Sequence, residues 1–523
     1  MYGPNILGFQ QSAIAKKFMY AFNPSTREIL EGAFHKATPE EIDQAMDLAT
    51  TAFTTYKKTS GAQRASFLNA IADEILALDD VLVKRAMAES GLPEGRIKGE
   101  RGRTVNQLRL FAKVAEEGSW VEASIDQAMP DRQPMPKTDI RKVLQPLGPV
   151  VVFTASNFPL AFSTAGGDTA SALAAGCPVI VKAHEAHLGT NALVSVAIQR
   201  AAEKTGMPDG VFSALNGTGP ELGQALAKHP QTKAIAFTGS HGAGKALFDA
   251  AAQRKNPIPV FAEMGSINPV FVLDNALSKR GEAIAKQYAS SVTLGAGQFC
   301  TNPGLIIVKN NAHGHTFIET LGQAIQAIAP ATMLNENVCK NYHAGRQSIL
   351  DNPKIQLEAS IENVSDGQCT NTVASVMASD FLENPSFQKE IFGPFTLVVK
   401  CSTDAQMMSI AERLEGQLTG TIMAEPSEIA SQNDLTETLQ NKVGRIIFNN
   451  VPTGVEVCHS MQHGGPYPAT TDGRFTSVGT GAIKRFARPI AFQNWPQDLL
   501  PDTLKDGNPT GIWRLMDGVF GKE

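Results

Sequence analysis

The chain has 523 residues, 42% of them hydrophobic and 19% charged, which is an ordinary globular composition with length for several domains. A net charge of −5 and a pI of about 6.1 argue against a nucleic-acid partner, because nucleic-acid binding requires a basic surface. The six cysteines form no CxxC pair, so neither a disulfide framework nor a metal site is expected. With no signal-peptide pattern and no membrane-length apolar run, we expect a cytoplasmic protein without a membrane partner.

Helical periodicity dominates the N-terminal part of the chain. Apolar residues at helical spacing predict a first helix that opens at Pro39, a second over 64–78 and a third over 100–117. The third segment carries four cations, which are Arg101, Arg103, Arg109 and Lys113. Residues 39–98 and 100–117 are therefore expected to be largely helical.

From residue 141 on, short β-rich runs alternate with helical segments. Strands are predicted over 150–153, 178–182, 210–215 and 234–238, with helices over 164–175, 190–205 and 219–227 between them. This alternation predicts an α/β fold with a parallel sheet and right-handed crossovers. Ligands bind such sheets at the carboxyl ends of the strands, where Lys182, Asn216 and Gly239 fall.

A second alternating block extends from residue 268 to about 450. Its predicted strands cover 268–273, 305–308, 374–377 and 395–399. The fold expected is thus two doubly wound parallel-sheet domains. The tail after residue 495 is rich in Pro, Asp and Lys, and an extended arm is expected there.

Cys300 lies in a segment, 295–304, that is rich in glycine and contains a proline. Such a composition breaks regular structure and lets the backbone approach a ligand closely. A thiol on this turn would be reachable and surrounded by backbone N–H donors, as a nucleophile that attacks a carbonyl requires. The alternative is a small buried hydrophobe, which most free cysteines are.

Four other segments carry candidate functional residues, each with a plainer alternative. The glycine-rich turn at 237–245 could present helix N–H groups to a phosphate, or be only a turn. Glu263, between two apolar runs, could be a desolvated general base or a solvated loop acid. Asn157 could donate to an oxyanion or cap its own turn, and Lys182 could bind a ribose or phosphate or lie on the surface.

Taken together and in order, these segments resemble the signature of the aldehyde dehydrogenase superfamily. The matching motifs are SNFPL with Asn157, CPVIV before Lys182, FTGS at 237–240, AEMGS with Glu263, GQFC ending at Cys300, and EIFGP with Glu390. The resemblance extends from residue 20 to about 495. It implies oxidation of an aldehyde to a carboxylic acid by a nicotinamide cofactor, through a thiohemiacetal and a thioester.

The resemblance also implies roles for individual residues. Cys300 would be the nucleophile, Asn157 and the Cys300 N–H would form the oxyanion hole, and Glu263 would activate the hydrolytic water. The implied cofactor-binding residues are Lys182, Glu185, Gly239, Ser240, Gly265, Glu390 and Phe392. Arg109 and Phe158 are the implied substrate-binding residues, with Arg109 as the anchor for a distal carboxylate.

Departures from the common motifs resemble one branch of the superfamily. Ser156 replaces the usual tryptophan, EMGSI at 263–267 replaces the usual ELGGK, and the segments 165–178 and 488–496 support the same branch. This branch comprises the 2-oxoglutarate-semialdehyde dehydrogenases and bacterial NADP-linked fatty aldehyde dehydrogenases. We therefore expect 2-oxoglutarate semialdehyde as substrate, with a medium- or long-chain fatty aldehyde as the alternative.

The cofactor expected is NAD. A glutamate three residues after Lys182, here Glu185, binds the adenosine ribose hydroxyls in NAD-preferring members and would repel a 2′-phosphate. NADP is the alternative, because His184 or His187 could tolerate a phosphate.

The resemblance also divides the chain. Residues 1–125 and 150–262 would form the dinucleotide-binding domain, 263–452 the catalytic domain, and 126–149 with 478–523 an oligomerisation arm and tail. Exposed sheet edges on such an arm are normally covered, so a homodimer is expected, with a tetramer as the alternative.

Three other functions compete with the dehydrogenase interpretation. A cysteine-dependent acyltransferase or hydrolase would leave Glu390 and Lys182 without a role. A non-catalytic relative of the same fold would have no need for Cys300, Glu263 and Asn157. A thiol protease is disfavoured because the histidines within thirty residues of Cys300, at 313 and 315, do not resemble a base.

Overall fold

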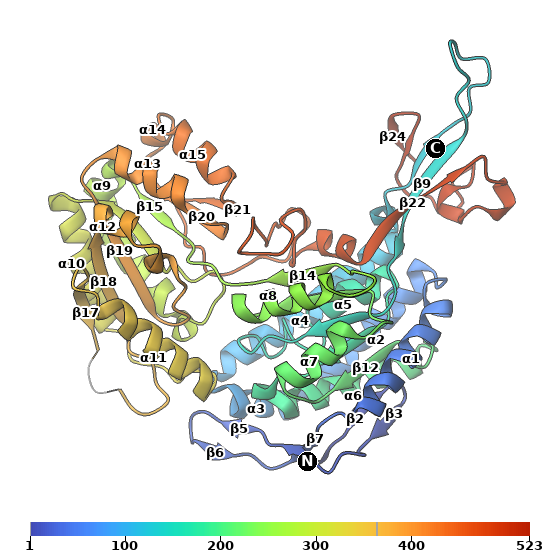
Figure 1. Ribbon diagram of the computed structural model, residues 1–523, viewed down its shortest axis with the longest axis horizontal. Helices are drawn as coiled ribbons and strands as arrows, with labels where there is room; N and C mark the ends of the chain where they lie inside the picture. The colour runs from blue at the N-terminus through green and yellow to red at the C-terminus, as the bar shows by residue number, and fades with distance from the viewer. Residues whose placement is uncertain (1, 362–363, 523) are drawn as a thin grey trace.

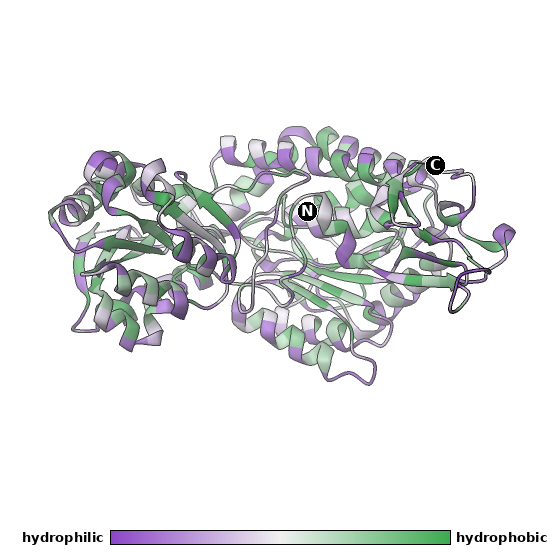
Figure 2. Ribbon diagram, turned by 90° about the horizontal axis from the view of Figure 1, so that it is seen from above, coloured by the Kyte–Doolittle hydropathy of each residue, from purple (hydrophilic) through white to green (hydrophobic). Residues whose placement is uncertain are grey.

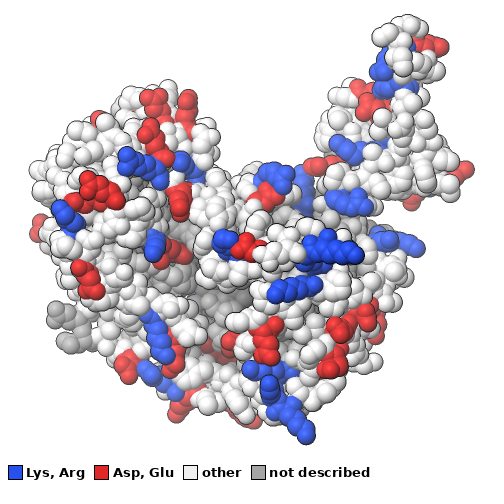
Figure 3. All heavy atoms as spheres, viewed as in Figure 1, with Lys and Arg blue, Asp and Glu red and all other residues white. Residues whose placement is uncertain are grey.

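The computed structural model describes residues 2–361 and 364–522, and two seven-stranded sheets organise it (Figure 1). Residues 1 and 523, the outer limits of the expected domains, lie outside the described residues. Within the described residues, no helix combines the length and apolarity that crossing a bilayer requires. Cationic and anionic side chains are interspersed over the face shown in Figure 3.

The first sheet has the strand order β14-β13-β10-β11-β12-β2-β3. Its parallel strands are β10 (Val150–Phe153), β11 (Val179–Lys182), β12 (Phe212–Leu215), β13 (Ala234–Thr238) and β14 (Val260–Glu263). The crossover helices are α5 (Gly167–Ala175), α6 (Leu188–Lys204), α7 (Gly219–Lys228) and α8 (His241–Ala252). The chain reverses its direction of sheet growth between β10 and β13, and ligands bind at such a switch point.

An antiparallel edge completes this sheet, which the sequence interpretation did not include. The strands β2 (Asn5–Leu7) and β3 (Gln10–Ser12) pair antiparallel with β12 and with each other. They are only three residues long, too short to show a period of two in the sequence.

Helices cover both faces of the first sheet. The N-terminal helices are α1 (Pro39–Tyr56), α2 (Gly61–Ala77), α3 (Asp79–Ser90) and α4 (Glu94–Glu117). Along β10, Val150 and Val152 pack into one core and Val151 and Phe153 into another, so side chains alternate between two buried faces. Burial on both faces explains why these strands read as continuous apolar runs, visible as green central strands in Figure 2.

The second sheet has the order β17-β18-β19-β16-β15-β20-β21. Its strands are β15 (Val270–Val272), β16 (Leu305–Lys309), β17 (Gln356–Ser360), β18 (Thr372–Met377), β19 (Phe395–Cys401), β20 (Gln417–Met423) and β21 (Val443–Phe448), of which β17 is antiparallel to its neighbour. The helices between them are α9 (Asp274–Thr293), α10 (Ala312–Gln326), α11 (Glu336–Leu350), α12 (Ala378–Glu383), α13 (Asp404–Arg413), α14 (Pro426–Ile429) and α15 (Asn433–Gln440).

A five-stranded sheet projects from the body as an arm (Figure 1). Its order is β22 (Ala487–Gln493), β9 (Ile140–Pro146), β8 (Ser124–Asp126), β23 (Arg514–Met516) and β24 (Val519–Gly521). The expectation of an extended tail after residue 495 is therefore wrong in part. The tail returns to pair β23 with β8 and buries Leu500, Leu504 and Ile512 against the arm, which offsets the cost of ordering it.

Candidate active site

A strained turn presents Cys300 between the two sheets. After α9 ends, Gly295, Ala296 and Gly297 take left-handed backbone angles, with φ of 56°, 59° and 65°. A Cβ on Gly297 would lie 2.3 Å from the carbonyl carbon of Gly393, so only glycine fits there. The composition of this segment predicted such a turn, and the structure supplies its physical reason.

The amide of Asn268 holds the other end of this turn. Its Nδ2 donates to the carbonyl oxygens of Cys300 and Asn302, at 2.9 Å each. Asn268 is fully buried and its own φ is 47°, a conformation that asparagine adopts more readily than most residues. The backbone around Cys300 is therefore clamped from the β14–β15 connection.

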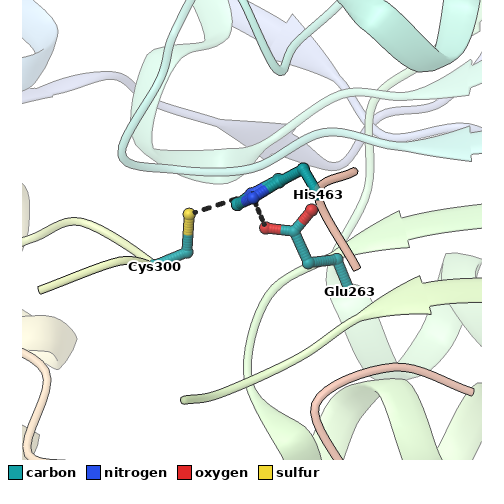
Figure 4. A group of neighbouring side chains, drawn as sticks. All are labelled: Glu263, Cys300 and His463. Atoms are coloured by element: carbon teal, nitrogen blue, oxygen red, sulfur yellow. Dashed lines mark hydrogen bonds and ion pairs between the residues drawn. The ribbon is translucent and has the colours of Figure 1, made fainter. Parts of the chain in front are cut away.

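Cys300, His463 and Glu263 form a thiol–imidazole–carboxylate group (Figure 4). The Cys300 Sγ lies 3.4 Å from His463 Nε2, and the same Nε2 lies 2.9 Å from Glu263 Oε1. The Ser477 hydroxyl donates to the second oxygen of Glu263, and the Thr476 hydroxyl accepts from the backbone N–H of His463 at 2.8 Å. The imidazole is thus placed to relay a proton from the thiol to the carboxylate.

Burial and charge set the protonation of this group. Burial and the neighbouring carboxylate of Glu263 raise the pKa of the Cys300 thiol well above its ordinary value, so the resting thiol is neutral. Burial alone would raise the pKa of Glu263, but His463 and the Ser477 hydroxyl outweigh it and lower that pKa. Glu263 is therefore an anion at neutral pH, although its side chain is buried.

A cavity of about 500 Å³ opens beside Cys300 at the carboxyl ends of β10, β11 and β13. The predicted site residues in its lining are Asn157, Lys182, Glu185, Gly239, Ser240, Gly265, Cys300, Glu390 and Phe392. The Asn157 amide donates to the carbonyl oxygen of Gln298 at 3.1 Å, which holds it against the Cys300 turn. Segments up to 235 residues apart, from Asn157 to Phe392, thus meet in one cavity.

The cavity fits a dinucleotide in several particulars. Helix α8 begins beside it with Ser240 as N-cap, so its free N–H groups can receive a phosphate. A Cβ on Gly265 would lie 2.4 Å from an oxygen of Glu390, so any larger residue at position 265 would clash with this carboxyl group. Burial raises the pKa of Glu390 to about 7, and its oxygens can exchange hydrogen bonds with sugar hydroxyls.

The aldehyde dehydrogenase family model matches residues 9–478 of this sequence. This chain belongs to the aldehyde dehydrogenase family. It is an NAD(P)-dependent enzyme that oxidises aldehydes to carboxylic acids, so the prediction of dehydrogenase chemistry is confirmed and the acyltransferase, protease and non-catalytic alternatives are set aside.

Curated relatives and solved structures agree with the family. The dehydrogenase is 48% identical over 518 residues to alpha-ketoglutaric semialdehyde dehydrogenase 2 of Azospirillum brasilense, covering 99% of each chain. It is 45% identical over 495 residues to alpha-ketoglutaric semialdehyde dehydrogenase of Acinetobacter baylyi, covering 93% of each. The structure of methylmalonate-semialdehyde dehydrogenase from Oceanimonas doudoroffii matches 95% of this chain and 99% of its own at a TM-score of 0.80 and 20% identity, which confirms the expected fold.

His463 is the residue that sequence reasoning missed in this dehydrogenase. The search for a base near Cys300 considered only histidines close in the chain, whereas His463 lies 163 residues away. The reason given against a cysteine–histidine pair was therefore wrong. The available signal in the sequence was the glycine- and proline-rich segment 463–468, which begins with His463 and predicts a turn.

Arg109 does not lie at the site. Its guanidinium pairs with Asp73 at 3.1 Å, its side chain is 45% exposed, and it is not in the cavity lining. The apolar residues Leu108 and Phe111 are buried, but the helical turn directs Arg109 away from them and into solvent. Phe158, in contrast, is buried next to Asn157 and packs edge-on against Phe299, with ring centroids 5.5 Å apart.

Proposed function

We propose that this dehydrogenase oxidises 2-oxoglutarate semialdehyde to 2-oxoglutarate with NAD, and that Cys300 is its nucleophile. The observation that carries the mechanism is the contact of Cys300 with His463 and Glu263 beside the cavity. The substrate is supported by two relatives, 48% and 45% identical over nearly their whole length, whose names specify alpha-ketoglutaric semialdehyde.

In the first half of the reaction, a neutral thiol must become a nucleophile. As the sulfur attacks the aldehyde carbon, His463 Nε2, 3.4 Å from the sulfur, takes the thiol proton and passes its own proton to the Glu263 carboxylate at 2.9 Å. The Asn157 amide turns from the Gln298 carbonyl to the developing oxyanion of the thiohemiacetal. A bound nicotinamide would supply the acceptor for the hydride from this carbon, which would leave a thioester on Cys300.

In the second half, water must attack the thioester. Once Glu263 has released the thiol proton to solvent, its buried carboxylate, 2.9 Å from His463 Nε2, can take a proton from water that enters the cavity. The thiolate leaves and recovers its proton from Glu263 through His463. The same two side chains thus serve both halves of the reaction.

The preference for NAD rests on Glu185 and its surroundings. Its Oε1 accepts from the Gly219 N–H at 2.8 Å and lies 3.5 Å from the Lys182 ammonium, which fixes a carboxylate at the cavity wall. Burial lowers the pKa of His184 well below its ordinary value, and that of His187 below it, so neither ring supplies a cation for a 2′-phosphate. Glu185→Thr should raise kcat/KM for NADP relative to NAD, and an unchanged ratio would rule out this role.

We also propose that the arm joins two subunits in a homodimer. Strand β22 is the outer strand of the arm sheet, and side chains exposed around it include Ile140, Trp495 and Leu499. An uncovered strand edge flanked by apolar side chains favours association with a second copy. Light scattering after size exclusion should give twice the monomer mass, and a monomer would refute the proposal.

The reaction itself is tested by following NAD and NADP reduction with 2-oxoglutarate semialdehyde, pentanal and a long-chain aldehyde. Wild-type protein should favour 2-oxoglutarate semialdehyde and NAD, and Cys300→Ser should remove the activity. A preference for the long-chain aldehyde with NADP would instead place the protein with the fatty aldehyde enzymes. Full activity in Cys300→Ser would refute the covalent mechanism.

A further inference from the structure

Two arginines of α4 approach an aromatic cluster that adjoins the reacting residues. The cluster consists of Phe158, Phe162 and Phe299, whose rings pack edge-on at 5.1 and 5.5 Å. Phe158 follows Asn157 in the chain and Phe299 precedes Cys300, so this cluster adjoins both residues. The residues of α4 that face it therefore help to shape the space next to the thiol.

The guanidinium groups of Arg96 and Arg103 contact these rings. The Arg96 guanidinium lies 4.4 Å from the Phe158 ring centroid and 4.9 Å from that of Phe299. The Arg103 guanidinium lies 5.8 Å from the Phe158 centroid and 5.4 Å from that of Phe162. Aromatic faces attract such cations and hold them in place without neutralising their charge.

Arg103 differs from its neighbours because it has no anionic partner in the described part of the chain. Arg96 pairs with Glu100 at 3.4 Å and Arg109 pairs with Asp73 at 3.1 Å. The Nε and Nη2 atoms of Arg103 are buried and make no hydrogen bond with the described residues. A buried guanidinium with unused donors is costly, and a bound anion would remove that cost.

The neighbouring charges do not satisfy Arg103 either. Glu100 directs one oxygen to the N–H groups of Leu160 and Ala161, at 2.8 and 2.9 Å, and the other to Arg96. Two guanidiniums and one carboxylate leave this cluster with one positive charge in excess. Burial lowers the pKa of Arg103, while Glu100 and Cys300 raise it, which is consistent with a guanidinium close to the thiol.

Another arginine near the thiol is already engaged. Arg445 also interacts electrostatically with Cys300, but its Nη2 donates to the carbonyl oxygens of Pro452, at 3.1 Å, and Gly454, at 3.5 Å. It therefore orders the chain that leads to His463. Among the described residues, Arg103 leaves two buried donors without a hydrogen bond, whereas Arg96 and Arg445 each leave only Nε.

We propose that Arg103, supported by Arg96, binds the distal carboxylate of the substrate and makes the enzyme selective for short aldehydes that end in a carboxylate. A guanidinium and a carboxylate form paired hydrogen bonds of defined geometry, so the anchor would also orient the aldehyde carbon toward Cys300. An uncharged aldehyde leaves the two buried donors of Arg103 without a partner, so it is disfavoured. This inference rests on the proposed function and assigns the carboxylate-binding role to Arg103 in place of Arg109.

The test compares Arg103→Met with Lys113→Met. Both variants remove one positive charge from α4, but Lys113 is exposed and forms no ion pair among the described residues. For each, kcat/KM is measured with 2-oxoglutarate semialdehyde and with pentanal, which has the same number of carbons and no charge. Arg103→Met should lower kcat/KM for the semialdehyde roughly 100-fold, mainly through KM, and leave pentanal unchanged or improved. Lys113→Met should match the wild type.

The two proposals fail in different ways. If the wild type does not favour the semialdehyde over pentanal, the proposed substrate is wrong, and the inference falls with it. If the wild type favours the semialdehyde but Arg103→Met lowers kcat/KM for both aldehydes equally, Arg103 has only a structural role and the inference alone is overturned. Arg103→Lys keeps the charge without the paired donors, so it should recover part of the preference, and a full loss equal to that of Arg103→Met would contradict charge recognition.

Discussion

Replacing His463 with alanine separates the two ways in which Cys300 could become a thiolate. In the structure, the imidazole lies 3.4 Å from the sulfur and can take its proton at the moment of attack. Without it, the reaction must begin from whatever thiolate is already present. The variant therefore reports how much of the rate depends on proton transfer within the thiol–imidazole–carboxylate group.

The size of the effect follows from the pKa of the thiol. At pH 7.5, a thiol with the ordinary pKa of 9.0 would be about 3% ionised, and burial with the Glu263 charge raises the pKa further. A variant that depends on this fraction should lose at least about 30-fold in the rate of hydride transfer. General-base catalysis contributes about 10²- to 10⁴-fold, which sets the upper range of the loss. The rate of the variant should rise nearly tenfold per pH unit, and less steeply in the wild type.

The assay is the pre-steady-state burst of NADH, which reports the steps up to the thioester before its hydrolysis limits turnover. His463→Ala should slow the burst, and Glu263→Gln should slow both the burst and steady-state turnover, because Glu263 receives the thiol proton in the first half of the reaction and the water proton in the second. A burst in His463→Ala within about 3-fold of the wild type, with the same pH profile, would refute the role of His463 as proton acceptor.

Three further predictions concern the same region. The pKa of Glu390 is about 7 in the folded protein and ordinarily 4.5, so the free energy of unfolding falls by roughly 3 kcal/mol as the pH rises through this interval. In calorimetry at pH 8, Glu390→Gln should therefore have a higher melting temperature than the wild type, and the difference should shrink toward pH 5. Gly297→Ala should lower both melting temperature and activity, because its Cβ would meet the carbonyl carbon of Gly393 at 2.3 Å, whereas Gly281→Ala, in open space on α9, should be neutral or stabilising. The donor atoms of the thiol–imidazole–carboxylate group lie within 4.8 Å of one another, so micromolar Zn²⁺ should inhibit the enzyme, and EDTA should restore the activity. His463→Ala should need at least about tenfold more Zn²⁺ for the same fractional inhibition.

Much of the fold was predictable because its signals are local. The strands at 150–153 and 234–238 have the bounds that their apolar runs predicted, and helix α5 begins at Gly167, three residues after its predicted start. Buried parallel strands show up as short apolar runs between helical periods. The antiparallel β2–β3 edge and the hairpin of β23 and β24 were not predictable in this way, because they exist through pairing with strands far away in the chain.

The site was predictable to the same extent. Asn157, Glu263 and Cys300 stand in motifs whose local composition indicates a strand end or a turn, and the structure brings all three together. His463 and Arg103 have no such motif. Their importance comes from what folding places beside them. His463 lies beside the thiol of Cys300, and Arg103 lies beside the aromatic cluster with no anionic partner among the described residues.

The neutral resting sulfur of Cys300 has a consequence for how the purified protein ages. Peroxide and alkylating reagents react with thiolates far faster than with thiols, so a protonated nucleophile is slow to oxidise to a sulfenic acid in air. The same protonation makes the apoprotein a poor target for covalent labels such as iodoacetamide. Stocks without added reductant should therefore keep their activity for long periods at neutral pH, and should lose it quickly when stored under alkaline conditions.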